Sequence, residues 1–112
     1  MNSTDLSAQP TVRQQLDAIN ERRRTKHLPV ARALRDPASA QAVIVAAKIQ
    51  IHLWREKNLC SNDYISAWEC LLLHPEQAAD MLEACSLEAI QLRQNSPFVA
   101  SVRYFREIDN AA

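Results

Sequence analysis

The 112-residue sequence contains no glycine, although average composition would give about eight. Glycine supplies the positive φ angles and close backbone approach that phosphate-binding loops, dinucleotide-binding turns, two-residue hairpins and nucleophile elbows require. Its absence therefore disfavours P-loop, Rossmann, serine-hydrolase and compact β folds. We predict an all-α protein, folded as a single small domain of five or six helices around a central long helix.

Composition sets further limits on partners and location. The chain is 47% hydrophobic and carries 13 basic and 13 acidic residues, so its net charge is zero, which favours neither nucleic acid nor membrane as a general partner. Three cysteines without a close pair are typical of a reducing compartment, and no apolar run is long enough for a membrane span. We expect a cytoplasmic protein without a cofactor.

The helical pattern begins after a polar tail. Residues 1–10 are expected to be disordered and residues 11–108 to form the domain. Apolar residues recur at helical spacing from Thr11 to Lys26, and Pro29 is expected to interrupt this helix. Asp36 and Pro37 are a helix-start signal.

Residues 37–57 form the longest predicted helix, and its apolar side chains lie on two nearly opposite stripes. A helix that is apolar on two sides has to be covered on two sides, so we predict that this is the central helix of the domain. The first stripe comprises Val43, Ile44, Ala47, Ile51 and Trp54, and the second comprises Ala42, Val45, Ala46, Ile49 and Leu53. The expected core contains Trp54, Trp68, Ile51, Ile65 and Leu71.

Charge is unevenly distributed along the sequence. Residues 1–36 contain seven basic and four acidic side chains, whereas residues 75–96 contain one basic and four acidic ones. A basic segment could contact phosphates, although it has no interleaved aromatic residues and offers little to distinguish bases. A solvated basic face is the alternative interpretation. The candidate nucleic-acid contacts are Arg22, Arg23, Arg24, Lys26, Arg32 and Arg35.

Arg22 and His27 have the Arg-x4-His spacing that resembles the ribonuclease motif of HEPN domains, which are also all-helical. The resemblance implies that the two side chains act together on an RNA phosphodiester. The match is partial, because Arg23 stands where a smaller polar residue is usual and the motif lies early in the chain. A basic helix end is the alternative, and we expect the protein not to be an enzyme, with no catalytic residue assigned.

Cys70 and His74 lie four residues apart, a spacing that can place two metal ligands on one helix face. The paired ligand spacings of zinc fingers and ribbons are absent. Cysteine among aromatic and aliphatic neighbours is more often a small buried hydrophobe. We therefore predict no metal site.

The segment from Leu92 to Phe98, Leu-Arg-Gln-Asn-Ser-Pro-Phe, has groups suited to docking. Arginine can pair with a carboxylate, amides can bond backbone, and phenylalanine can fill a pocket. The alternative interpretation is a helix end followed by a helix start, with the phenylalanine in the protein's own core. The candidate partner-binding residues are Arg93, Gln94, Asn95 and Phe98.

This segment, with Arg-Ala-Leu-Arg-Asp-Pro at 32–37, Trp54 and Cys-Ser-x-x-Tyr-Ile-x-x-Trp at 60–68, resembles a group of small helical bacterial proteins from toxin–antitoxin-like or defence operons. The resemblance implies an antitoxin or regulatory protein that binds the product of a neighbouring gene. A DNA-binding regulator that uses residues 22–35 is the alternative.

Overall fold

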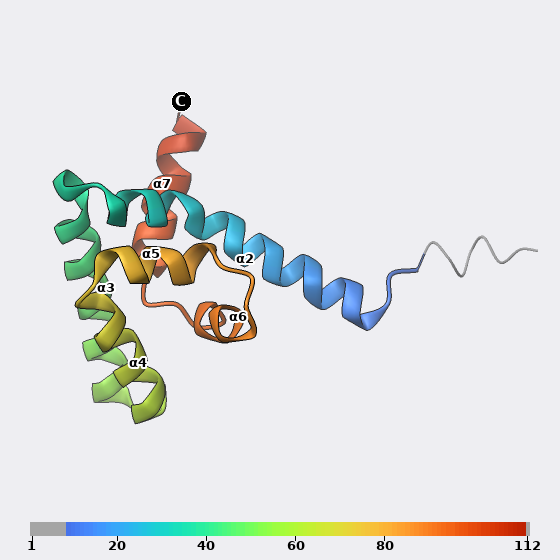
Figure 1. Ribbon diagram of the computed structural model, residues 1–112, viewed down its shortest axis with the longest axis horizontal. Helices are drawn as coiled ribbons and strands as arrows, with labels where there is room; N and C mark the ends of the chain where they lie inside the picture. The colour runs from blue at the N-terminus through green and yellow to red at the C-terminus, as the bar shows by residue number, and fades with distance from the viewer. Residues whose placement is uncertain (1–8, 112) are drawn as a thin grey trace, which may run out of the picture.

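A computed structural model describes residues 9–111 and shows an all-helical single domain (Figure 1). Most of the predicted tail, residues 1–8, lies outside the described residues. Residues 9–111 contain no strand, and the last helix continues beyond the predicted limit at residue 108. The helices are α2 (Val12–Arg35), α3 (Pro37–Lys57), α4 (Asn62–Leu72), α5 (Pro75–Glu83), α6 (Leu87–Arg93) and α7 (Val99–Ala111).

Helix α2 runs without interruption through Pro29, so the predicted break at this residue is wrong. Proline cannot donate a hydrogen bond to the carbonyl four residues earlier, here that of Thr25, which is exposed and therefore open to water. His27 and Val30 are buried on either side of the proline. Tertiary packing of this face stabilises the helix where local propensity disfavours it.

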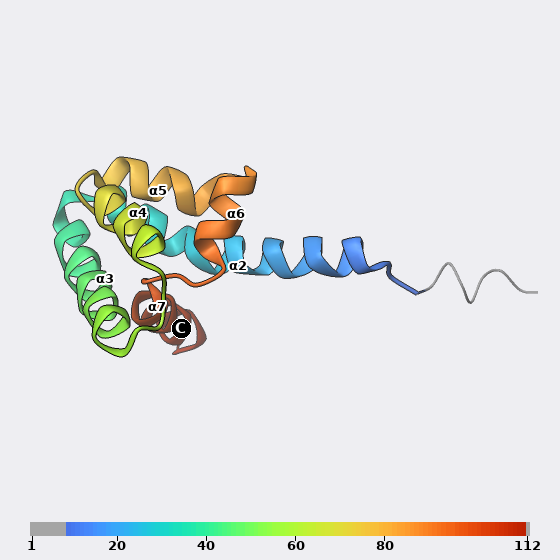
Figure 2. The ribbon, with the colours of Figure 1, turned by 90° about the horizontal axis from the view of Figure 1, so that it is seen from below.

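The central element is α2 rather than α3, which corrects the predicted architecture. Helix α2 packs against α3, α5, α6 and α7, whereas α3 lies at one end of the molecule (Figures 1 and 2). As a result, only the first apolar stripe of α3 is buried. In the second stripe Ala46 is half-buried, and the other members, Ala42, Val45, Ile49 and Leu53, are exposed.

The ends of α3 are fixed by capping residues other than glycine. The Asp36 carboxylate accepts a hydrogen bond from the Ala38 amide at 3.0 Å, and Pro37 occupies the first turn. Asn58 adopts the left-handed conformation, with φ 54° and ψ 43°, which asparagine tolerates better than most residues. The Leu59 amide then donates to the Trp54 carbonyl at 2.9 Å.

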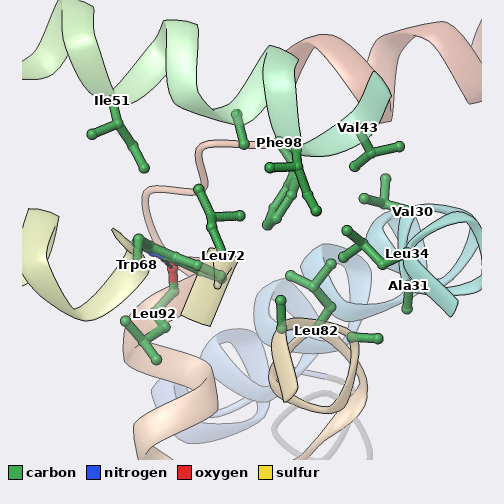
Figure 3. Packing of buried hydrophobic residues seen from close by; sticks show 14 of the residues in the cluster. Val30, Ala31, Leu34, Val43, Ile51, Trp68, Leu72, Leu82, Leu92 and Phe98 are labelled. Carbon is green, nitrogen blue, oxygen red and sulfur yellow. Dashed lines mark hydrogen bonds between the residues drawn. The ribbon is translucent and has the colours of Figure 1, made fainter. Parts of the chain in front are cut away.

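The core lies where α2, α3, α4 and α5 meet the segment around Phe98 (Figure 3). Trp54, Trp68, Ile51 and Ile65 are buried as predicted, but Leu71 is only half-buried and Leu72 takes its place. Leu72 follows Trp68 by four residues and Ile65 by seven, so the three share one helix face. The rings of Trp68 and Phe98 meet edge to face with centroids 5.4 Å apart.

Candidate functional site

The turn between α6 and α7 is anchored by a buried histidine on α2. His27 Nδ1 lies 2.6 Å from the Arg23 carbonyl, which can only accept, so Nδ1 carries the proton. His27 Nε2 lies 2.8 Å from Ser96 Oγ, and this oxygen accepts from the Phe98 amide at 3.0 Å. A neutral imidazole therefore donates at one nitrogen and accepts from the serine hydroxyl at the other.

Burial keeps His27 neutral. Only 6% of the residue is exposed, and loss of solvation lowers the pKa of His27, with the positive charges of Arg93 and Lys26 acting in the same direction. The hydrogen bond to the Arg23 carbonyl opposes this effect on the pKa. Both ring nitrogens already have partners, so the histidine acts as a structural connector between α2 and the turn.

Arg93 closes the end of α5 from inside the protein. Its Nη1 donates to the carbonyls of Met81, Leu82 and Ala84 at 2.9, 3.3 and 2.6 Å. Helix α5 has no basic residue in its last turn, and the final carbonyls of a helix need outside donors. Arg24 Nε adds a bond of 2.6 Å to the Glu83 carbonyl.

Only 3% of Arg93 is exposed, and desolvation lowers the pKa of its guanidinium. Its Nε has no hydrogen-bond partner among the described residues. The Arg93 side chain is therefore directed at the three carbonyls inside the protein and does not extend into solvent.

Tyr64 on α4 holds the same turn from the other side. Its hydroxyl lies 2.6 Å from the Leu92 carbonyl and 2.8 Å from the Asn95 carbonyl, and it accepts from the Asn95 amide at 3.2 Å. Burial raises the pKa of Tyr64. The Asn95 side chain reaches Cys60 Sγ at 3.0 Å. The turn is thus tied to α2 and α4 by polar contacts, while Arg93 ties the end of α6 to α5.

These contacts divide the predicted partner-binding residues into two groups. Phe98 is fully buried and Arg93 almost so, and both therefore serve the protein's own interior in this fold. Gln94 and Asn95 are exposed at the turn. Any partner contact of this segment has to be made by these two amides and by the surface beside them.

That surface is a cavity of about 260 Å³ between α2, the turn and α7. Among the described residues, its charged lining is entirely basic: Lys26 of α2, Arg93 behind the turn, and Arg103 and Arg106 of α7. Lys26, Arg103 and Arg106 are exposed, and none of them is in an ion pair with a described residue, although Arg24, Arg35 and Arg55 are. We call this hollow the basic cavity; its other lining residues are His27, Gln94, Asn95, Ser96, Val99 and Val102.

Two of the predicted nucleic-acid contacts are already engaged within the chain. Arg35 bonds Glu76, Asp80 and Glu83 of α5 at 2.6 to 2.7 Å, and these carboxylates raise the pKa of the guanidinium. Arg24 pairs with Glu21 at 2.8 Å.

The other four predicted contacts also lie on α2. Arg22, Lys26 and Arg32 are exposed and Arg23 is half-buried. Arg22 and Lys26 are four residues apart and share a face, whereas Arg32 points elsewhere around the helix. The basic segment therefore splits into Arg22 and Lys26 on one face, with Lys26 at the basic cavity, and an arginine, Arg32, on another face.

The structure does not bring Arg22 and His27 together. Five positions along one continuous helix place them about 140° apart around its axis. Arg22 is exposed while His27 is buried with both nitrogens bonded. Cys70 and His74 are also exposed, and the described residues contain no group of three or more side chains suited to a metal ion.

Arg103 and Arg106 were missed by the sequence analysis. They lie three residues apart on α7, a spacing that places two side chains on one helix face, but their proximity to Lys26 depends on how α7 packs against α2.

Comparison with protein families, with curated proteins and with solved structures finds no match. Among residues 9–111, no helix combines the length and the hydropathy that crossing a bilayer requires.

Proposed function

We propose that this chain is a non-catalytic binding protein that holds an acidic segment of a protein partner in the basic cavity. The observation that carries the proposal is the convergence of Lys26, Arg103 and Arg106 on one hollow with a basic lining. Exposed cations without an internal partner attract carboxylates, and arginine can bind a carboxylate with two parallel hydrogen bonds.

The rim of the basic cavity supports a protein ligand. The amide side chains of Gln94 and Asn95 lie beside the basic groups and can bond the backbone of an extended or turned segment. The turn that carries them is fixed by His27 and Tyr64, so little ordering is needed when a partner binds. The resemblance to operon-encoded helical proteins suggests a cytoplasmic partner from a neighbouring gene, which the chain would neutralise as an antitoxin or regulate.

The test is co-purification of the neighbouring gene's product with the full chain. We expect Arg103→Glu combined with Arg106→Glu to abolish capture, because reversed charge repels an acidic segment. Arg32→Glu is the matched control, since it reverses an exposed arginine that does not line the basic cavity. Capture that survives the double reversal, or that is lost equally in the control, would overturn the proposal.

DNA binding is the second candidate, because Lys26 lines the basic cavity with Arg103 and Arg106 and shares an exposed face of α2 with Arg22. Phosphate binding would weaken strongly as salt rises. A mobility shift on the chain's own promoter at two salt concentrations separates the candidates. Nucleic-acid binding predicts a low-salt shift that is reduced by Arg22→Glu, whereas an acidic protein ligand predicts no shift.

A further inference from the structure

A second hollow lies on the opposite face of α7 and is apolar. It has a volume of about 540 Å³ and lies between α3 and α7. Most of its lining residues are small, which lets a bulky side chain approach the backbone closely. No charged side chain among the described residues lines it, so it selects neither an acidic nor a basic ligand. We call it the apolar groove; its main residues are Ala38, Ala42, Ala46, Ala100, Tyr104 and Phe105.

The apolar groove adjoins further exposed apolar residues of α3 and α7. Ile49 of α3 is 67% exposed and Tyr104 of α7 is 58% exposed. Such a two-helix groove suits an amphipathic helix that inserts aliphatic side chains at helical spacing. A contiguous apolar face of this kind on a small domain marks an interaction site.

The first two turns of α2, residues 12–18, form what we call the arm. Every one of these residues is exposed. Val12 and Leu16 are 72% and 54% exposed, and with Ile19 they form a stripe at positions i, i+4 and i+7. The helix start is nevertheless well built, because Thr11 and Gln14 form a reciprocal capping box with bonds of 2.9 and 3.0 Å.

The arm and the apolar groove cannot meet within one chain. The arm extends from one end of the molecule, while α3 lies at the other end in both views (Figures 1 and 2). Helix α2 is continuous from Val12 to Arg35, so the arm cannot fold back without breaking the helix. Each chain therefore presents an apolar helix end and an apolar groove that are complementary in kind and separated in space.

We infer that the apolar groove binds the arm of a second copy of this chain, and that the second copy's groove binds the first arm. An uncharged stripe meets an uncharged groove, and burial of both removes exposed apolar surface from water. One such contact is small beside the roughly 1,200–2,000 Å² buried in specific interfaces. A two-fold pair forms it twice and closes the assembly.

Sedimentation velocity of the full chain at a series of concentrations tests this inference. We expect a dimer for the wild type and monomers for Leu16→Asp on the arm and Ala42→Glu in the groove. Both positions are exposed, so circular dichroism should show unchanged helix content. Ala18→Asp is the matched control on the exposed opposite side of the arm and should remain dimeric.

Mixing the two disrupted variants separates arm exchange from pairing of two grooves. Leu16→Asp keeps an intact groove and Ala42→Glu keeps an intact arm, so the mixture should form a dimer through one remaining contact, weaker than the wild type. A monomeric wild type, a dimeric Leu16→Asp variant, a species larger than a dimer, or a mixture without any heterodimer at concentrations well above those at which the wild type dimerises would overturn the inference. The basic cavity is untouched by these variants, so partner capture tests the proposed function separately.

Discussion

The two hollows lie on opposite faces of α7 and are lined by different kinds of residue. The basic cavity is bounded by a turn that is hydrogen-bonded to the His27 imidazole of α2 and the Tyr64 hydroxyl of α4, with exposed cations at its rim. The apolar groove is bounded by two helices whose facing side chains are mostly small. The first is a preformed polar site, whereas the second is stabilised only when another apolar surface covers it.

The largest expected difference between the two hollows is in stability. Phe98→Ala, behind the basic cavity, should lower the free energy of unfolding by about 3–5 kcal/mol, because it removes a fully buried ring packed on Trp68. Tyr104→Ala, in the apolar groove, should change the stability of the monomer by no more than about 0.5 kcal/mol. Urea denaturation followed by circular dichroism measures both, at a protein concentration low enough for the monomer to predominate.

Phe98→Leu keeps this comparison measurable if the alanine variant does not fold. It should produce a smaller loss of stability in the same direction as Phe98→Ala. Equal losses of stability in Phe98→Leu and Tyr104→Ala would show that the two hollows do not differ in their contribution to stability.

Within the basic cavity, two arginines should behave in opposite ways. Arg93→Ala should lower the free energy of unfolding by roughly 2–3 kcal/mol, because three carbonyls at the end of α5 lose a charged donor. Arg103→Ala should leave stability within about 0.5 kcal/mol of the wild type but weaken partner capture. Thermal or urea unfolding and the co-purification assay together measure the contrast.

Arg93→Lys separates charge from geometry in the same experiment. A single ammonium cannot reproduce the planar guanidinium, so lysine should restore only part of the stability lost in Arg93→Ala. Full restoration by lysine, or a large loss in Arg103→Ala, would contradict the division into a structural and a surface arginine.

The sequence predicted the helical class and most of the core, because these depend on local signals. The missing glycine, the Asp36-Pro37 start and the buried stripe through Ile51 and Trp54 can all be recognised within one or two turns. The position of α3 could not be predicted in this way. Both its stripes are apolar, and only tertiary packing decides that one is buried and the other exposed.

The candidate site was predictable only in part for the same reason. The segment ending at Phe98 stood out as a motif, but its alternative interpretation, a helix junction with the ring in the core, matches the position of that ring. Lys26 was identified from its basic neighbours on α2. Arg103 joins it through the packing of α7 against α2, which places two residues 77 positions apart at one cavity, and no local pattern encodes this proximity.

The smallest expected effect concerns the histidine that fixes the basic cavity. Burial lowers the pKa of His27 in the folded state, while in the unfolded chain it is near 6.5. Below about pH 6.5 the unfolded state therefore binds a proton that the folded state resists, so stability should fall as the pH drops from 7.5 to 5.5.

His27→Gln should reduce this acid-side loss of stability, because an amide does not titrate. Urea denaturation at both pH values measures the difference, and an unchanged pH dependence in His27→Gln would show that protonation of His27 does not cause the acid-side loss of stability.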